Sequence, residues 1–226
     1  MIKKWYPFAI LLILPSLALA QSNTDFIWRP IVGYSWSGTD KLNYSIKLEM
    51  FNSVEDFDNR SAIQYIEPQF SASYSISPNI KLGGGFYSRW VDPLEPGYAY
   101  EQRLLQQISV NSFIGNYRFT HRARLEQRFR NTNYLNRFRY LISHRLPLHG
   151  KTIDPGENFL VFSNDAMLSF NRTIFSGENR AEIGIGWLFQ NQQQFELTLG
   201  YRTKNIFTDS DIGHVFLLTT SFQVKN

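Results

Sequence analysis

The chain has 226 residues, and its 23 Lys and Arg exceed its 19 Asp and Glu by four. This charge excess is too small to indicate nucleic-acid binding, so no nucleic acid is expected among the partners. The chain has no cysteine, which excludes a disulfide framework, a thiolate metal site, a cysteine nucleophile and a lipidated N-terminal cysteine.

The N-terminus has the pattern of a secretory signal peptide. Lys3 and Lys4 precede a short apolar run, Trp5–Leu14, and the small-residue site Ala18-Leu19-Ala20 follows it. The run is too short to span a membrane, so cleavage is favoured over the alternative of an uncleaved N-terminal anchor. We therefore predict a signal peptide at residues 1–20 and a single domain at residues 21–226.

The rest of the chain consists of strand patterns separated by turn residues. The predicted strands are Leu42–Phe51, Ser61–Ser77, Asn79–Val91, Tyr98–Gly115, Tyr117–Asn131, Tyr134–Leu148, Phe159–Asn171, Asn179–Asn191, Gln193–Asn205 and His214–Lys225. They exceed the roughly five to six residues typical of soluble sheets and suit the ~9–11 residues with which a tilted strand crosses a membrane. Aromatic residues make up 16% of the chain and gather near strand ends, as interfacial girdles require.

A less regular segment, Phe26–Ser37, precedes the ten clear strands. It could pair partially, enter the interior of the barrel or form an extra crossing, so about 10–12 strands are expected. An extra crossing would break the even strand number usual in such barrels.

The connections alternate between short and long. Ser77-Pro78-Asn79, Gly115-Asn116 and Asn191-Gln192 are tight, and counting back from a periplasmic C-terminus places them on the periplasmic side. Leu148–Asn158 is an exception, because it is a long connection on that same side.

The alternation is clearest along Tyr117–Asn131, where one face carries five arginines and a glutamate and the other is largely apolar and aromatic. A soluble sandwich would also alternate. Strand length, and a polar face of Arg, Glu and Gly, favour the barrel. The expected fold is therefore all-β: a transmembrane, antiparallel, up-and-down β-barrel with its apolar face toward lipid.

Turn positions predict which charged residues face each other. A turn at Asn131–Asn133 would place Glu126 opposite Arg139, and His121 opposite His144 on the outward face. A turn centred on Gln192 would place Glu182 opposite Arg202.

Charges inside a narrow barrel need partners, because an unpaired buried charge costs several kcal/mol. The charge network predicted in the interior is Glu101, Arg103, Arg122, Arg124, Glu126, Arg128, Arg137, Arg139, Asp165, Arg180, Glu182 and Arg202. A structural network that fills the barrel is favoured over a narrow, anion-preferring pore or a ligand site.

The run Arg122-Ala-Arg124-Leu-Glu126-Gln-Arg128-Phe, followed by Arg137-Phe-Arg139-Tyr, resembles the arginine-rich hairpin of an uncharacterised bacterial outer-membrane family, known only as a domain of unknown function. Glu101-Gln-Arg103 and Asn179-Arg180 are similar to its other recurring pieces. The resemblance implies an outer-membrane barrel and brings no activity and no catalytic residues.

Enzyme signatures are scarce. The sequence contains no nucleophile elbow, HExxH, P-loop or dinucleotide fingerprint. A lipid-facing acyl hydrolase is an alternative because Ser143 adjoins His144, but Ser143 has inward parity. The interior carboxylates would be held ionised by arginine, which makes them poor general acids. No catalytic residue, metal or cofactor is predicted.

Three function classes remain: a structural or minor-pore barrel, a lipid-modifying enzyme, and an assembly or binding component of the envelope. The expected location is the bacterial outer membrane. The expected partners are outer-membrane lipids and, during insertion, the barrel-assembly machinery.

Overall fold

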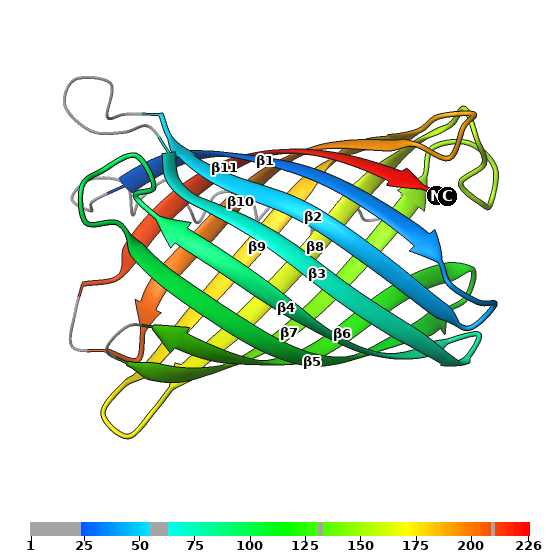
Figure 1. Ribbon diagram of the computed structural model, residues 1–226. Coiled ribbons are helices and arrows are strands. Elements are labelled where there is room, and N and C mark those ends of the chain that lie inside the picture. The colour runs from blue at the N-terminus through cyan, green and yellow to red at the C-terminus, as the bar shows by residue number, and fades with distance from the viewer. Residues whose placement is uncertain (1–23, 55–62, 131–132, 209–210) are drawn as a thin grey trace.

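The computed structural model describes residues 24–54, 63–130, 133–208 and 211–226, and these ranges contain eleven strands. The strands close into one barrel in which each pairs with its neighbours in sequence, and β1 pairs with β11 (Figure 1). The strands are β1 Thr24–Ser37, β2 Leu42–Ser53, β3 Ile63–Ser77, β4 Ile80–Val91, β5 Ala99–Ile114, β6 Tyr117–Arg130, β7 Tyr134–Pro147, β8 Asn158–Phe170, β9 Phe175–Leu188, β10 Gln194–Ile206 and β11 Gly213–Lys225. The predicted all-β, up-and-down barrel is confirmed. Within the described ranges, no helix is long and apolar enough to cross a membrane.

The segment expected to be irregular is a full strand. β1 pairs antiparallel with β2 and parallel with β11, where Trp28 lies opposite Leu218. With an odd number of strands the first and last run in the same direction, so the barrel closes through a parallel pair. Ile27 and Ile31 point inward, and these apolar side chains interrupt the polar alternation by which the other strands were recognised.

The predicted registers of two hairpins are wrong by two residues. Glu126 lies opposite Arg137, while Arg139 lies opposite Arg124. The Arg130 amide donates to the Asn133 carbonyl, which centres this connection one residue earlier than the predicted turn. A shift of one residue at the turn moves every cross-strand partner by two, and a two-residue shift keeps each side chain on its face.

The same error affects the other two predicted pairs. Arg202 lies opposite Arg180, while Glu182 lies opposite Gly200. His144 lies opposite Phe119, and His121 lies opposite Ile142, so the two histidines are not cross-strand partners.

The two faces of the wall differ completely in charge. The register places every Asp, Glu, Lys and Arg of the eleven described strands on the inward face, the one that carries the fully buried Glu126. The outward face carries large exposed apolar side chains, including Val32, Leu48, Ile183 and Leu199. The wall is thus inverted relative to a soluble protein, whose charged side chains face outward.

Outward aromatic side chains form ring contacts near both ends of the barrel. Near the end that holds the β1–β2 turn, Trp36 stacks between Tyr34 and Tyr44, and Trp187 contacts Phe195. Near the opposite end, further contacts pair Phe26 with Phe216, Phe129 with Tyr134, and Phe175 with Phe207. Aromatic side chains therefore gather near both ends, although Phe70 and Phe86 also point outward in mid-strand.

A small apolar cluster lies inside the barrel. It consists of Ile27, Phe51, Tyr65, Val215 and Leu217, which belong to strands next to the parallel closure. Elsewhere the interior is mainly polar, so the charged side chains fill most of what a soluble protein would use as its core.

One inward glycine makes room for a large interior side chain. Phe159 is 1% exposed, and a Cβ at Gly186 would lie 2.2 Å from its Cζ. A larger residue at Gly186 would therefore force the Phe159 ring to move.

Candidate functional site

The interior contains two regions that differ in how charge is balanced. The first, the ion-pair layer, consists of six carboxylates and the ten arginines that bind them. Its members are Glu67, Glu101, Glu126, Asp165, Glu178, Glu182, Arg29, Arg89, Arg103, Arg124, Arg128, Arg130, Arg137, Arg139, Arg180 and Arg202.

Glu101, on β5, binds three of these arginines. Arg128 forms a two-pronged contact with it, with Nε 2.9 Å from Oε1 and Nη2 2.9 Å from Oε2. Arg103 and Arg130 also donate to the same carboxylate. Arg103 then reaches Glu67 at 3.2 Å, which Arg89 binds from the other side at 2.6 Å. The contacts thus join strands β3 to β6 across the interior.

Glu126 is 0% exposed and lies at the centre of the layer. Although Arg139 is not directly opposite, its Nη1 reaches Glu126 Oε1 diagonally at 3.1 Å. Arg124 lies 3.6 Å and Arg103 3.9 Å from the same carboxylate. Arg139 also binds Asp165, which Arg180 contacts at 3.2 Å.

The remaining two carboxylates extend the layer toward the parallel closure. Glu178 binds Arg137 at 3.0 Å and also binds Arg202. Glu182 binds Arg29 of β1 at 2.7 Å, so the first strand contributes to the layer. Hence the predicted contact between Glu182 and Arg202 does not form, and each residue has a different partner.

Eleven of the twelve residues predicted for the charge network take part in these ion pairs, and Arg122 is the exception. Five members of the layer were not in the predicted set: Arg29, Glu67, Arg89, Arg130 and Glu178. Arg29 and Glu178 lay outside the clear strands that were predicted, since β9 begins at Phe175 rather than Asn179. Inward parity alone identifies Glu67 and Arg89.

The ion-pair layer is not fully hydrogen-bonded. Among the described residues, Glu126 Oε2 and Asp165 Oδ1 are buried without a hydrogen-bond partner, as is Arg128 Nη1. Burying ions in this way costs several kcal/mol, which Coulomb attraction repays only when the remaining donors and acceptors are satisfied. The layer is therefore a poor device for stability alone.

The second region is a cavity of about 1360 Å³ on the side of the barrel that holds the β1–β2 turn and the end of β11. The inner ends of its walls are members of the ion-pair layer, such as Arg137 and Arg139, whereas Glu101, Arg128 and Glu178 lie outside its lining. The long connection after β7 contributes Gly150, Lys151, Thr152 and Ile153 at the mouth.

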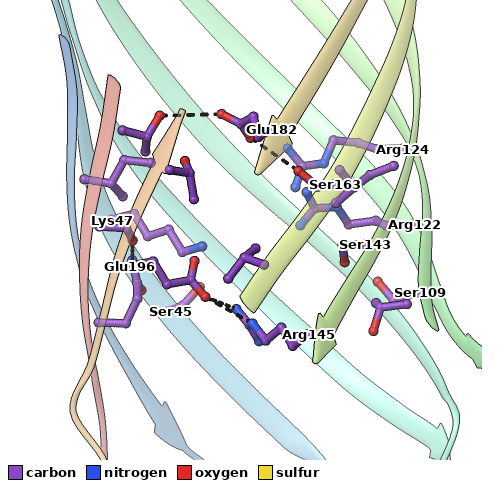
Figure 2. A pocket seen from close by; sticks show the side chains of 18 of the residues that line it. Ser45, Lys47, Ser109, Arg122, Arg124, Ser143, Arg145, Ser163, Glu182 and Glu196 are labelled. Carbon is purple, nitrogen blue, oxygen red and sulfur yellow. Dashed lines mark hydrogen bonds and ion pairs between the residues drawn. The ribbon is translucent and has the colours of Figure 1, made fainter. Parts of the chain in front are cut away.

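Cations outnumber acids along this cavity. Four lining cations form no ion pair among the described residues: Lys47, Arg118, Arg122 and Lys151. Arg145 binds Glu196 at 2.8 Å, and Glu49 accepts a hydrogen bond from Gln69 at 3.3 Å. Figure 2 shows Lys47 extending from one wall toward the space that Arg122 and Arg124 enter from the other. The cavity is thus cationic, and we use the name cationic cavity for it.

The outward face holds one hydrogen-bonded chain of reactive side chains. Ser112 Oγ lies 2.8 Å from His121 Nε2, and His121 Nδ1 lies 2.8 Å from the Tyr140 hydroxyl. His144 instead contacts the Arg118 carbonyl, and the register puts Ser143 on the inward face and His144 on the outward face, so their side chains do not share a site. The described His, Asp and Glu side chains form no group of three that could hold a metal ion.

Comparison with known proteins gives a family and no activity. A family described as "Protein of unknown function (DUF2490)" matches residues 33–213, which is most of the chain. The match contains β2 to β10 in full, the end of β1 and the first residue of β11. No curated protein and no solved structure matches the chain.

Proposed function

We propose that this chain, which belongs to the DUF2490 family of unknown function, is an outer-membrane barrel closed to passage by its ion-pair layer and open at one end as the cationic cavity. The asymmetry of the interior carries this proposal. Along the barrel axis, paired side chains occupy one part of the interior, while the other part holds a cavity of about 1360 Å³.

The wall supports the membrane location. An outward face without a charged side chain in any described strand suits hydrocarbon, because Arg or Lys there costs about 2–4 kcal/mol near the bilayer midplane. The aromatic contacts near both ends match the girdles of membrane barrels. The predicted signal peptide would deliver the chain to that membrane.

The orientation follows from the usual topology of such barrels. Their short turns and C-termini lie on the periplasmic side. Since the cavity lies at that end of this barrel, it would open to the periplasm, and the ion-pair layer would face outward. A barrel of this kind presents a polar chamber without forming a continuous path.

Fractionation and conductance test the two parts of the proposal. We expect the protein in the outer-membrane fraction, with a gel mobility that changes when the sample is boiled. In planar bilayers we expect no steady conductance. Recovery as a soluble periplasmic protein would refute the membrane location, and steady open-channel currents would refute the closed end.

Lipid hydrolysis is a second candidate, favoured by one observation. The chain of contacts from Ser112 through His121 to Tyr140 has the order of a nucleophile, a base and an orienting group, and it faces outward. A fluorophosphonate probe should label Ser112 in reconstituted protein, and His121→Asn should abolish the labelling. If Ser112 is not labelled, the contacts of Ser112, His121 and Tyr140 are hydrogen bonds at the membrane interface without a catalytic role.

A further inference from the structure

Two cations of the cationic cavity enter it from different walls, and neither binds a carboxylate among the described residues. Lys47 lies on β2 and Arg122 lies on β6, and three strands separate them around the wall. Neither forms an ion pair among the described residues, although both line the cavity (Figure 2).

These cations repel each other and their neighbours. Lys47 is repelled by Arg122, Arg124 and Arg145, and Arg122 is repelled by Arg124 and Arg139, although Asp165 attracts it. Like charges held together in a wall of low dielectric destabilise a protein unless a counter-charge joins them. In the ion-pair layer, carboxylates compensate the repulsion between the arginines, whereas in the cavity the repulsion between Lys47 and Arg122 is not compensated by an ion pair among the described residues.

The acids that line this part of the cavity do not compensate for the excess. Glu196 is bound by Arg145 and accepts a further hydrogen bond from Gln194 at 2.7 Å. Glu49 attracts Lys47 and has no ion-pair partner among the described residues, but it is one acid against four unpaired cations. A net positive charge therefore remains for a ligand.

The rest of the wall suits an anion that also carries hydroxyl groups. Many small hydroxyl side chains line the cavity, each able to donate or accept a hydrogen bond. They include Ser45, Ser109, Ser143 and Ser163 (Figure 2). The volume of about 1360 Å³ exceeds the ~300–1,000 Å³ of typical small-molecule pockets. A ligand larger than a bare inorganic anion would fit.

From these features we infer that the cationic cavity binds a phosphate-bearing ligand, with the phosphate between Lys47 and Arg122 and a polar body along the hydroxyl-lined wall. Arginine matches phosphate with a planar fork of donors, and lysine adds a mobile point charge. This inference rests on the proposed closed end, because the ligand enters and leaves through the one open mouth.

Calorimetric titration of the detergent-solubilised protein with pyrophosphate at low salt tests the site. We expect saturable binding that Lys47→Gln and Arg122→Gln each weaken by about 10- to 100-fold, the range for a lost charge-assisted contact. Glu49→Gln should tighten binding, since it removes a competing acid. Lys81→Gln is the matched control, because Lys81 is an exposed strand lysine with inward parity outside the cavity lining, and it should leave binding unchanged.

The source of the phosphate is decided by competition. Displacement of pyrophosphate by glucose 6-phosphate would identify a soluble phosphate ester, whereas displacement in nanodiscs containing phosphatidylglycerol would identify a lipid headgroup. No saturable binding by the wild-type protein, or equal weakening by the Lys81 variant, would overturn the site. Binding does not depend on conductance, so a failure here is distinct from a failure of the closed barrel.

Discussion

The ion-pair layer and the cationic cavity share the same strands but balance charge in opposite ways. In the layer each carboxylate binds at least two arginines, as Asp165 binds Arg139 and Arg180. In the cavity, Lys47 and Arg122 lie on the same inward face and bind no carboxylate among the described residues. The difference follows from access to water: the buried charges of the layer need partners, whereas water reaches Lys47 and weakens, without removing, its repulsion from the neighbouring arginines. Side chains of the layer should therefore matter for stability, and those of the cavity for ligands.

The largest loss of stability should come from a substitution at Glu126, in the ion-pair layer. Glu126→Ala leaves Arg103, Arg124 and Arg139 without the carboxylate they share, and Glu126 is 0% exposed. Removing one partner of a buried ion pair costs about 3–5 kcal/mol. We expect the free energy of unfolding, measured by urea titration in micelles, to fall by that amount.

The double variant with Arg139→Ala separates pairing from general damage. If Arg139 and Glu126 interact, removing both should cost less than the sum of the single losses. Additive losses in this cycle would mean that the 3.1 Å contact contributes nothing to stability.

The comparison also assumes that both regions share a lipid-facing outer wall. Leu199 points outward and is 64% exposed, so Leu199→Arg should cost about 2–4 kcal/mol in a bilayer. Ser73→Arg adds the same side chain to the cavity and should cost much less. Equal unfolding free energies for the two variants in lipid vesicles would mean that the outer wall does not meet hydrocarbon.

Sequence alone predicts which face each side chain occupies, but not its partner. Along β6 the alternation correctly puts Arg122, Arg124 and Glu126 inward, because a strand has a period of two. Their cross-strand partners depend on where the turn is centred, and a one-residue error there moved Arg139 from its predicted place opposite Glu126 to a place opposite Arg124. Long arginine side chains nevertheless reach diagonal partners, which is why Arg139 still binds Glu126.

The sequence alone could not predict which part of the interior holds paired charges and which part holds the cavity. Arg122 and Arg124 are two residues apart on one strand and both line the cavity, yet Arg124 binds Glu126 while Arg122 forms no ion pair among the described residues. Which of them is paired depends on the strands across the barrel, and that requires the strand number. The apolar Ile27 and Ile31 concealed β1, so neither the odd count nor the contact of Arg29 with Glu182 could be predicted.

A smaller effect is expected from the ion pair within the cavity. Arg145 binds Glu196 at 2.8 Å, but the Arg145 side chain is 52% exposed. Exposed pairs contribute about 0–1 kcal/mol, so Glu196→Ala should lower the free energy of unfolding by no more than that. If Glu196→Ala lowered the free energy of unfolding as much as Glu126→Ala does, the ion pairs of the cavity and of the layer would not differ in their contribution to stability.

The smallest effect on stability should come from Lys47→Gln. Whether this substitution raises or lowers the free energy of unfolding tests most directly whether the layer and the cavity differ. Lys47 is repelled by three arginines and attracted by one acid, Glu49. Lys47→Gln should therefore leave the free energy of unfolding within about 0.5 kcal/mol of the wild-type value or raise it, as for substitutions away from packed or paired groups. Added salt should reduce any gain, because screening weakens the repulsion that the substitution removes. A clear loss of stability in Lys47→Gln, measured without added phosphate, would show that Lys47 holds the wall together and is not reserved for a ligand.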